Sequence, residues 1–335
     1  MGKGLNKTWL KAHLGSLLSY GGLVLCIIVF SILSQGGLWS AYNIRILFQG
    51  VCVYAIVSMG AVFIYSMGYM DISVGAQIGV YCLLCILISN ATGSLLLGFL
   101  SILCIALVCG LINGYVAVML GLPSIVTSIF LNSIFGGVQM LIMEWQGTNS
   151  ISIEADMSMF KGTGSMVAAI VVIAAISVYL YKFTPLGKYV QGIGANETAT
   201  KLCGVSTTKW KVIAYAFFGL CIAVGALFLT ARTGAAGKGT GTGYAMDIMV
   251  ALLLGGMPLS GGMRSKVSSA LIGSFTYVIL TNGLTLAGVE TSYMYVIKAV
   301  IFLAIIVITC RKKEEFCQDK YWNKFWGRLW MNKED

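Results

Sequence analysis

The stretch that decides the fold is Leu95-Leu-Leu-Gly-Phe-Leu-Ser-Ile-Leu-Cys-Ile-Ala-Leu-Val-Cys-Gly-Leu-Ile-Asn-Gly-Tyr-Val-Ala-Val-Met-Leu120, which contains no charged residue. An α-helix needs about 17–25 mostly apolar residues to cross the hydrocarbon layer of a membrane, so this run is long enough to span it. Over the whole chain of 335 residues, 58% are hydrophobic and 10% are charged. A soluble domain has about 25% charged residues, and the composition therefore excludes one.

Further apolar stretches, separated by glycine, proline or charged residues, follow the same pattern. The sequence therefore predicts an all-α polytopic membrane protein with about ten transmembrane helices, some of them broken or re-entrant. The predicted spans are 17–34, 45–66, 72–90, 94–120, 124–143, 166–182, 211–231, 244–257, 267–286 and 293–310.

The net charge of +10 could point to nucleic acid, but the cations cluster at the two ends of the chain and in one central segment. Cytoplasmic segments of membrane proteins carry an excess of lysine and arginine. We therefore expect no nucleic-acid partner, and we expect both termini and the central loop 183–210 to be cytoplasmic, as an even number of spans requires. The cations concerned are Lys3, Lys7, Lys11, Lys182, Lys188, Lys201, Lys209, Lys211, Arg311, Lys312 and Lys313.

The chain is predicted to form one transmembrane domain over 1–310, followed by a cytoplasmic tail over 311–335. In the tail, aromatic residues between Tyr321 and Trp330 recur at helical spacing among basic residues. This pattern favours an amphipathic helix that lies on the membrane surface in contact with lipid. A disordered tail and a partner-binding helix are the alternatives.

The sequence holds no set of side chains suited to catalysis. His13 is the only histidine, so no Ser-His-Asp or Cys-His arrangement can form. The pair Cys82 and Cys85 lacks the second pair that a metal site needs. The segment 234–240 does not match a phosphate-binding loop, because glycine follows Lys238 where serine or threonine is required. We therefore expect a protein that is not an enzyme, without a cofactor or metal, and any ATP to be hydrolysed by a separate chain.

Three ionisable residues are predicted at membrane depth, where a charge normally faces a partner or water. Asp71 lies in a glycine-flanked break, Asp247 begins the short span 244–257, and Lys298 lies in the last span. Asp247 and Lys298 are expected at similar depth near the outer face and could form an ion pair. A purely structural role, as a helix-locking pair or a break without solute contact, is the alternative.

Two segments resemble each other: Gly68-Tyr-Met-Asp-Ile-Ser-Val-Gly75 and Gly255-Gly-Met-Pro-Leu-Ser-Gly-Gly262. Both follow a span predicted to run from outside to inside. Transporters often place internal repeats around the solute path, so the pair suggests a parallel repeat, with chance similarity in glycine-rich sequence as the alternative.

The central loop contains the signature of a short helix. Asn196 is a favourable N-cap, Glu197 follows in the first turn, and Gly204 is a typical stop. A capped helix between two spans could be a rigid docking surface, or the segment could be only a basic topology anchor.

Six ordered blocks from about residue 44 to 310 identify a resemblance to a known family. They are the central loop, Asp71-Ile-Ser-Val-Gly75, Ile112-Asn-Gly114, Gly243-Tyr-Ala-Met-Asp247, Leu259-Ser-Gly-Gly262 and Thr281-Asn-Gly-Leu284. Together they resemble the ribose-type sugar permeases of bacterial ABC importers, in the branched-chain amino acid/ribose permease superfamily.

The resemblance implies a multi-pass protein of the bacterial inner membrane that translocates a small polar solute, most simply a monosaccharide. It implies a second permease subunit, identical or different, cytoplasmic ATP-binding subunits, and an extracellular or periplasmic solute-binding protein. The candidates for ATPase coupling are Gly194, Asn196, Glu197, Thr198, Ala199, Leu202 and Gly204. The candidates for the translocation path are Tyr69, Asp71, Ser73, Gly75, Asp247, Ser260 and Lys298.

The chain departs from the family pattern at positions that bear on the solute. Tyr69 replaces a glycine, Met70 an isoleucine and Ala245 an acid, while Ala195 and Thr200 differ in the coupling segment. A nucleoside or branched-chain amino-acid permease of the same superfamily therefore stays open as an alternative. So does a stand-alone secondary carrier.

Overall fold

The computed structural model describes residues 19–258, 260–290, 292–294, 296–301 and 303. The chain divides into two compact units, 1–286 and 287–335, and each is considered by itself. The basic N-terminal residues, the end of the last predicted span and the predicted tail helix lie outside the described residues.

Seven helices of the first unit are long and apolar enough to cross a membrane, which confirms an α-helical polytopic membrane protein. Their bounds agree with the predicted spans to within four residues, because long apolar runs fix where helices lie. They are α2 (Ala41–Ser66), α3 (Val74–Thr92), α4 (Leu95–Met119), α5 (Ser124–Trp145), α7 (Thr163–Phe183), α10 (Thr207–Thr233) and α12 (Val267–Leu286).

The other three predicted spans are represented by shorter apolar helices: Ser19–Leu33, α11 (Tyr244–Leu254) and Ser292–Ile301 in the second unit. α11 has 11 residues. At 1.5 Å per residue it covers about 16 Å, roughly half of the hydrocarbon layer of about 30 Å. The predicted span 244–257 is therefore not a complete transmembrane helix.

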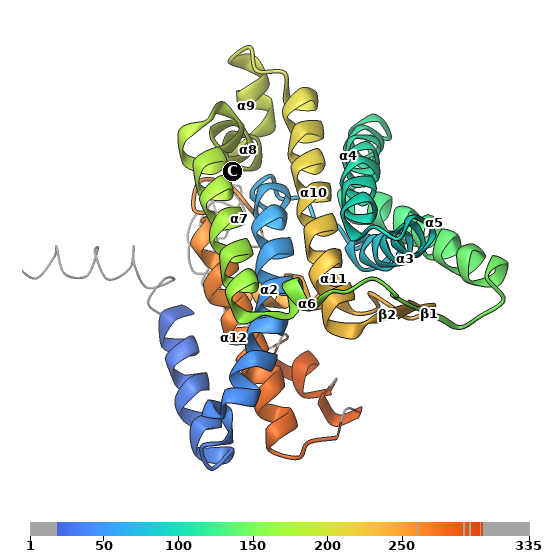
Figure 1. Ribbon diagram of the computed structural model, residues 1–335. Coiled ribbons are helices and arrows are strands. Elements are labelled where there is room, and N and C mark those ends of the chain that lie inside the picture. The colour runs from blue at the N-terminus through green and yellow to red at the C-terminus, as the bar shows by residue number, and fades with distance from the viewer. Residues whose placement is uncertain (1–18, 259, 291, 295, 302, 304–335) are drawn as a thin grey trace, which may run out of the picture. The chain divides into compact units, whose positions relative to one another are not determined.

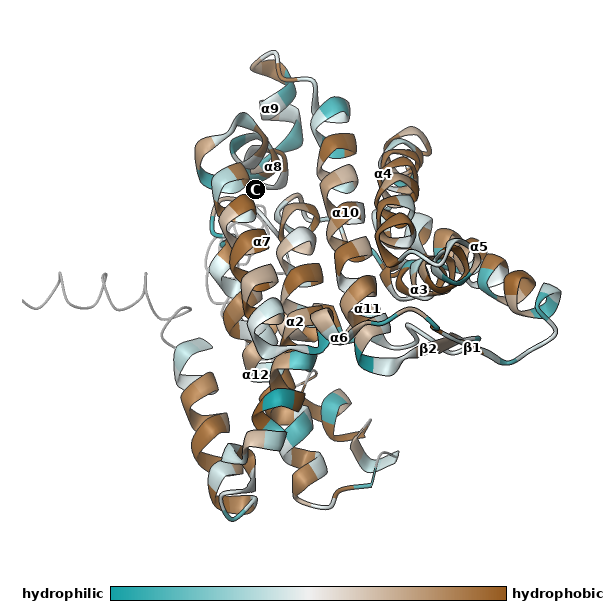
Figure 2. Ribbon diagram, viewed as in Figure 1, coloured by the Kyte–Doolittle hydropathy of each residue, from teal (hydrophilic) through white to brown (hydrophobic). Residues whose placement is uncertain are grey.

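The long helices of the first unit fall into two groups. α2, α3, α10 and α12 are mostly buried against their neighbours, whereas α4, α5 and α7 leave most of their apolar surface uncovered. Figure 1 shows α10 beside α2 and α4. Hydrophobic residues run along the uncovered faces of α4, α5 and α7, and hydrophilic ones gather on α8 and α9 (Figure 2). Uncovered apolar faces of this size suit lipid or another membrane chain.

Short elements connect the long helices. They are η1 (Gly37–Trp39), β1 (Ser150–Ser152), α6 (Ser158–Lys161), α8 (Pro185–Ala195), α9 (Glu197–Leu202) and β2 (Ala235–Gly237). β1 and β2 pair antiparallel, and Asn90 Nδ2 donates to the carbonyl of Ser152 at 2.9 Å. The strand pair was not predicted. It joins the loop between α5 and α6 to the segment between α10 and α11.

α11 and α12 approach so closely that two glycines are required. A β-carbon on Gly255 would lie 1.8 Å from the carbonyl oxygen of Ser269, and one on Gly273 would lie 1.8 Å from that of Ala251. Small residues permit this backbone contact in a membrane. The pair positions α11, which carries Asp247 in its first turn.

We expect Gly273→Ala to separate α11 from α12 and to destabilise the protein by about 1–3 kcal/mol, a typical cost of overpacking. The matched control is Gly136→Ala in α5, where an added β-carbon meets nothing within 4 Å and should be neutral or slightly stabilising. Thermal unfolding in detergent would measure both. Equal melting temperatures for the two variants would contradict this packing.

Candidate functional site

The break between α2 and α3 spans residues 67–73 and contains three path candidates. Asp71 is 3% exposed, and its Oδ1 accepts hydrogen bonds from the backbone N–H of Ser73, at 2.8 Å, and from the Ser73 hydroxyl. The carboxylate thus lies at the N-terminus of α3, where negative charge is favourable. Ser73 Oγ in turn accepts from Gln77 Nε2 at 2.8 Å.

The second oxygen of Asp71 is buried and has no hydrogen-bond partner among the described residues. Tyr65 and Tyr215 lie close enough to Asp71 to interact with it electrostatically. A buried carboxylate oxygen without a partner is costly. The cap of α3 uses only Oδ1 of Asp71, and the place of Asp71 in the translocation path stays a prediction.

The two similar segments found in the sequence meet at the end of α2. The backbone N–H of Gly262 donates to the carbonyl of Ser66 at 2.8 Å, and the carbonyl of Ser260 would lie 3.3 Å from a β-carbon on Gly68. Gly194, at the end of α8, packs against the same carbonyl of Ser66. The candidates Gly194 and Ser260 therefore belong to one junction.

Gly75 is buried and packs against the turn that precedes α11. A β-carbon on Gly75 would lie 2.6 Å from the carbonyl oxygen of Gly241. This contact accounts for glycine at the position, since any side chain would push the turn away.

Asp247 is surrounded by tyrosines that sequence reasoning did not select. The hydroxyl of Tyr54 donates to Asp247 Oδ2 at 3.0 Å. The ring of Tyr54 stacks on Tyr244 and meets Tyr277 edge to face, with both centroids 5.1 Å away. We call Tyr54, Tyr244, Tyr277 and Asp247 the tyrosine cluster. No local pattern marks these rings, which come from three helices.

The position of Tyr54 corrects the expected depth of Asp247. Tyr54 lies halfway along α2, so its partner Asp247 lies near the middle of that span rather than near the outer face. The reason is that α11 begins inside the bundle, after the segment 234–243. Lys298 belongs to the second unit, and its pairing with Asp247 stays a prediction.

The central loop forms two helices, α8 and α9, of which only α9 was predicted. Asn196 caps α9 as expected, since its Oδ1 accepts from the backbone N–H of Ala199 at 3.0 Å. The helix ends before Gly204, whose φ of +79° suits glycine. Thr198 and Ala199 are exposed, and Leu202 is 85% exposed, so α9 presents an uncovered surface with an apolar residue on it.

Glu197 faces the other way, toward Lys211 at the start of α10. Lys211 Nζ donates to Glu197 Oε1 and to the hydroxyl of Tyr69, each at 2.7 Å. The ammonium also lies 4.9 Å from the centre of the Tyr69 ring. Glu197 forms a second ion pair with Lys201 at 2.9 Å. Burial raises the pKa of Glu197, but the hydrogen bonds from Lys211 and Lys201 outweigh it, so the pKa is lower than usual.

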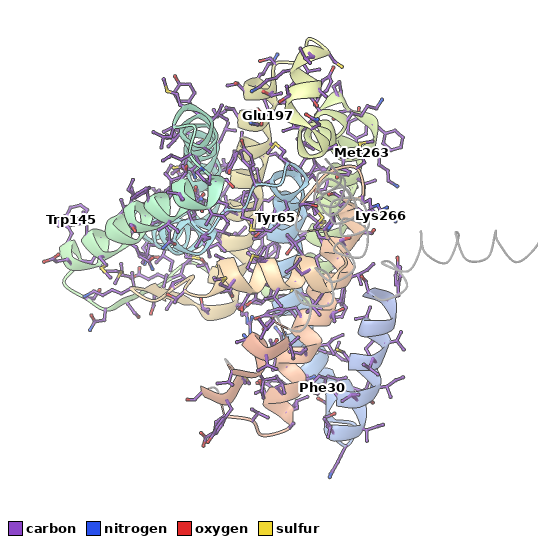
Figure 3. The ribbon with its side chains drawn as sticks, turned by 180° about the vertical axis from the view of Figure 1, so that it is seen from behind. Phe30, Tyr65, Trp145, Glu197, Met263 and Lys266 are labelled. Atoms are coloured by element: carbon purple, nitrogen blue, oxygen red, sulfur yellow. The ribbon has the colours of Figure 1, made fainter. Side chains whose placement is uncertain are left out.

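The sequence analysis grouped Lys211 with the other basic residues of the predicted cytoplasmic loop. The structure buries its side chain to 4% exposure and joins it to Tyr69 across 142 residues. The available signal was the position of Lys211 at the very start of the apolar run 211–231. Figure 3 shows Glu197, Met263 and Lys266 toward the end of the unit that carries α8 and α9, with Phe30 toward the opposite end.

These features define a class of protein. Long helices with uncovered apolar faces surround buried polar breaks, and the described residues offer no group of three histidines, cysteines or acids that could hold a metal. Long helices around buried polar breaks are the construction of a membrane transport protein. The chain matches, over residues 43–306, the family described as the permease component of the branched-chain amino acid transport system, and it belongs to that family. It is a transport subunit and not itself catalytic.

Individual relatives match nearly the whole chain. The ribose import permease protein RbsC of Escherichia coli K12 is 28% identical, with 90% of this chain and 96% of the relative covered. RbsC of Bacillus subtilis is 31% identical, with 87% and 91% covered. The fructose import permease protein FrcC of Rhizobium meliloti is 24% identical, with 85% and 82% covered. No solved structure matches the chain.

The lowered pKa of Glu197 makes the attachment of α9 depend on pH. A carboxylate whose pKa is lower in the folded state contributes stability above its unfolded value of about 4.3, and this contribution is lost as the pH falls through the folded value. We expect hydrogen exchange of the α9 amides, corrected for the intrinsic rate, to accelerate below about pH 4. Glu197→Gln should remove this dependence. An identical pH profile in that variant would contradict the role of Glu197.

Proposed function

We propose that the chain is the membrane-spanning permease of an ABC importer that takes up a monosaccharide delivered by an extracellular or periplasmic binding protein. The observation that carries this proposal is the match to ribose import permeases along nearly the whole chain. A xylose transport permease of Haemophilus influenzae adds a partial match, 33% identical over 46% of this chain.

The tyrosine cluster supports a sugar as the solute. Tyrosine rings offer apolar faces with a polar tip, and a carboxylate accepts hydrogen bonds from hydroxyl groups. Tyr244 and Asp247 are partly exposed, whereas Tyr277 is buried behind Tyr54. Rings and one carboxylate at the middle of the bundle suit a small neutral molecule that carries hydroxyl groups.

The proposed assembly contains two permease subunits, two cytoplasmic ATP-binding subunits and the binding protein, in a bacterial inner membrane. We propose one permease domain over 1–310 with ten membrane segments and both termini cytoplasmic. α11 and the segment 234–243 together form one broken segment, because α11 alone is too short to cross. The uncovered faces of α4, α5 and α7 are available to lipid and to the second permease.

A branched-chain amino acid is the second candidate solute, because the matching family is described by that transport system. The two candidates differ in charge. An amino acid carries an ammonium and a carboxylate. Asp247 in the cluster, and Arg232, which lies close enough to Tyr244 to interact with it electrostatically, carry the opposite charges.

Reconstitution into liposomes with its ATP-binding subunit and binding protein tests the function. We expect ATP-driven uptake of labelled ribose, xylose or fructose. We expect no uptake of leucine or adenosine. The purified chain alone should not hydrolyse ATP, since it has no phosphate-binding loop. Uptake of leucine instead of sugars would favour the second candidate, and ATP hydrolysis by the chain alone would refute the assignment.

The exposed surface of α9 is the proposed docking site for the ATP-binding subunit. Leu202→Asp should leave insertion and yield unchanged, because Leu202 is 85% exposed, but it should reduce co-purification of the ATP-binding subunit at least tenfold. Thr208→Asp is the matched control, since it adds the same charge at an exposed position of α10. Normal co-purification with Leu202→Asp would reject α9 as the docking site.

A further inference from the structure

We infer that Lys211 is a positioning residue that ties the docking helix α9 to the break between α2 and α3. The inference rests on the proposed function, because it assigns a route by which a displacement of α9 reaches the membrane segments. The three groups involved come from three elements: Glu197 from α9, Lys211 from α10 and Tyr69 from the break 67–73.

The burial of Lys211 separates this contact from an ordinary surface ion pair. Its side chain is 4% exposed, against 58% for Lys201, the other partner of Glu197. An exposed pair four residues apart already supports a short helix. A buried ammonium, in contrast, must keep its partners, because a lone buried charge is strongly unfavourable. Glu197 and Tyr69 are therefore held together through Lys211.

α9 depends on this contact because it has little packing of its own. None of its residues is buried, and it packs against α8 and α10. At one end, α8 is fixed where Gly194 meets the carbonyl of Ser66. From α9 itself, the side chain of Glu197 is the group that reaches the bundle, through Lys211 and, at 3.3 Å, through the hydroxyl of Thr207.

The residues after Tyr69 carry a displacement onward. The backbone N–H of Met70 donates to the hydroxyl of Ser124 at 3.1 Å, and Ser124 begins α5. Asp71 caps the start of α3 through Ser73. A movement of Tyr69 would therefore displace the first residues of two membrane helices, α5 and α3.

Tyr69 contributes two parts of its side chain to this link. The hydroxyl and the ring of Tyr69 both contact the ammonium, which combines a hydrogen bond with a cation–π interaction.

The test uses the complete assembly in liposomes and a mixture of labelled ribose, xylose and fructose. For Lys211→Met, which also releases Glu197 and so loosens α9, we expect at least a fivefold loss of sugar taken up per ATP. For Tyr69→Phe, which keeps the pair of Glu197 and Lys211, we expect normal co-purification of the ATP-binding subunit and normal basal ATP hydrolysis. Lys211→Arg should restore part of the loss. Lys209→Met is the matched control, an exposed lysine two residues away, and should behave as the wild type.

Tyr69→Phe keeps the ring and removes only the hydroxyl, so it decides the question if Lys211→Met does not fold. It should lower uptake per ATP by about half or more. Uptake per ATP within 20% of wild type in Tyr69→Phe, or within twofold in Lys211→Met, would overturn the inference. Loss of the ATP-binding subunit from Tyr69→Phe would also overturn it, since the contact with Tyr69 would then serve docking. Absence of ATP-driven uptake in the wild-type assembly would instead refute the proposed function.

Discussion

The structure depends on one constraint: inside a bilayer, every backbone N–H and C=O group needs a partner within the protein. The helices satisfy this internally, but the segments before α3 and α11 do not. Here side chains supply the missing bonds. Gln139 Nε2 donates to the carbonyls of Gly237 and Thr240, at 2.7 and 3.1 Å, and the hydroxyl of Ser124 accepts from Met70. Irregular backbone is thus stable where these residues reach it.

Glycine helps to meet the same constraint, because it lets two irregular backbone segments pack close together. Gly261, with φ of +65°, lies so close to the end of α2 that a β-carbon would meet the carbonyls of Tyr65 and Ser66 and the N–H of Gly68 within 2.6 Å. The backbone of one irregular segment is therefore the partner of the other. Val74 and Gly75 already belong to α3, whereas the residues of the two segments that meet here lie between helices.

Features that depend on local sequence patterns could be predicted, whereas features that depend on contacts between distant residues could not. The seven long helices follow from apolar runs, and the cap at Asn196 follows from its side chain and the N–H of Ala199, three residues away. The tyrosine cluster joins Tyr54 to Asp247 across 193 residues, and no periodicity reveals such a pair. The depth of Asp247 was wrong for a related reason, since an apolar run of that length was assumed to start at the membrane surface.

The two faces of α9 have different roles because the helix is short: one is held by the bundle and the other is exposed. A helix of six residues is too short to be stable alone, so something must hold it while one face stays free for a partner. Asn196 closes its first turn, and Lys211 holds Glu197 on the inner face. Leu202 then stays exposed without loss of the helix. Because the inward anchor is a buried charge that also contacts Tyr69, α9 cannot shift relative to the break without breaking this contact or carrying Tyr69 along.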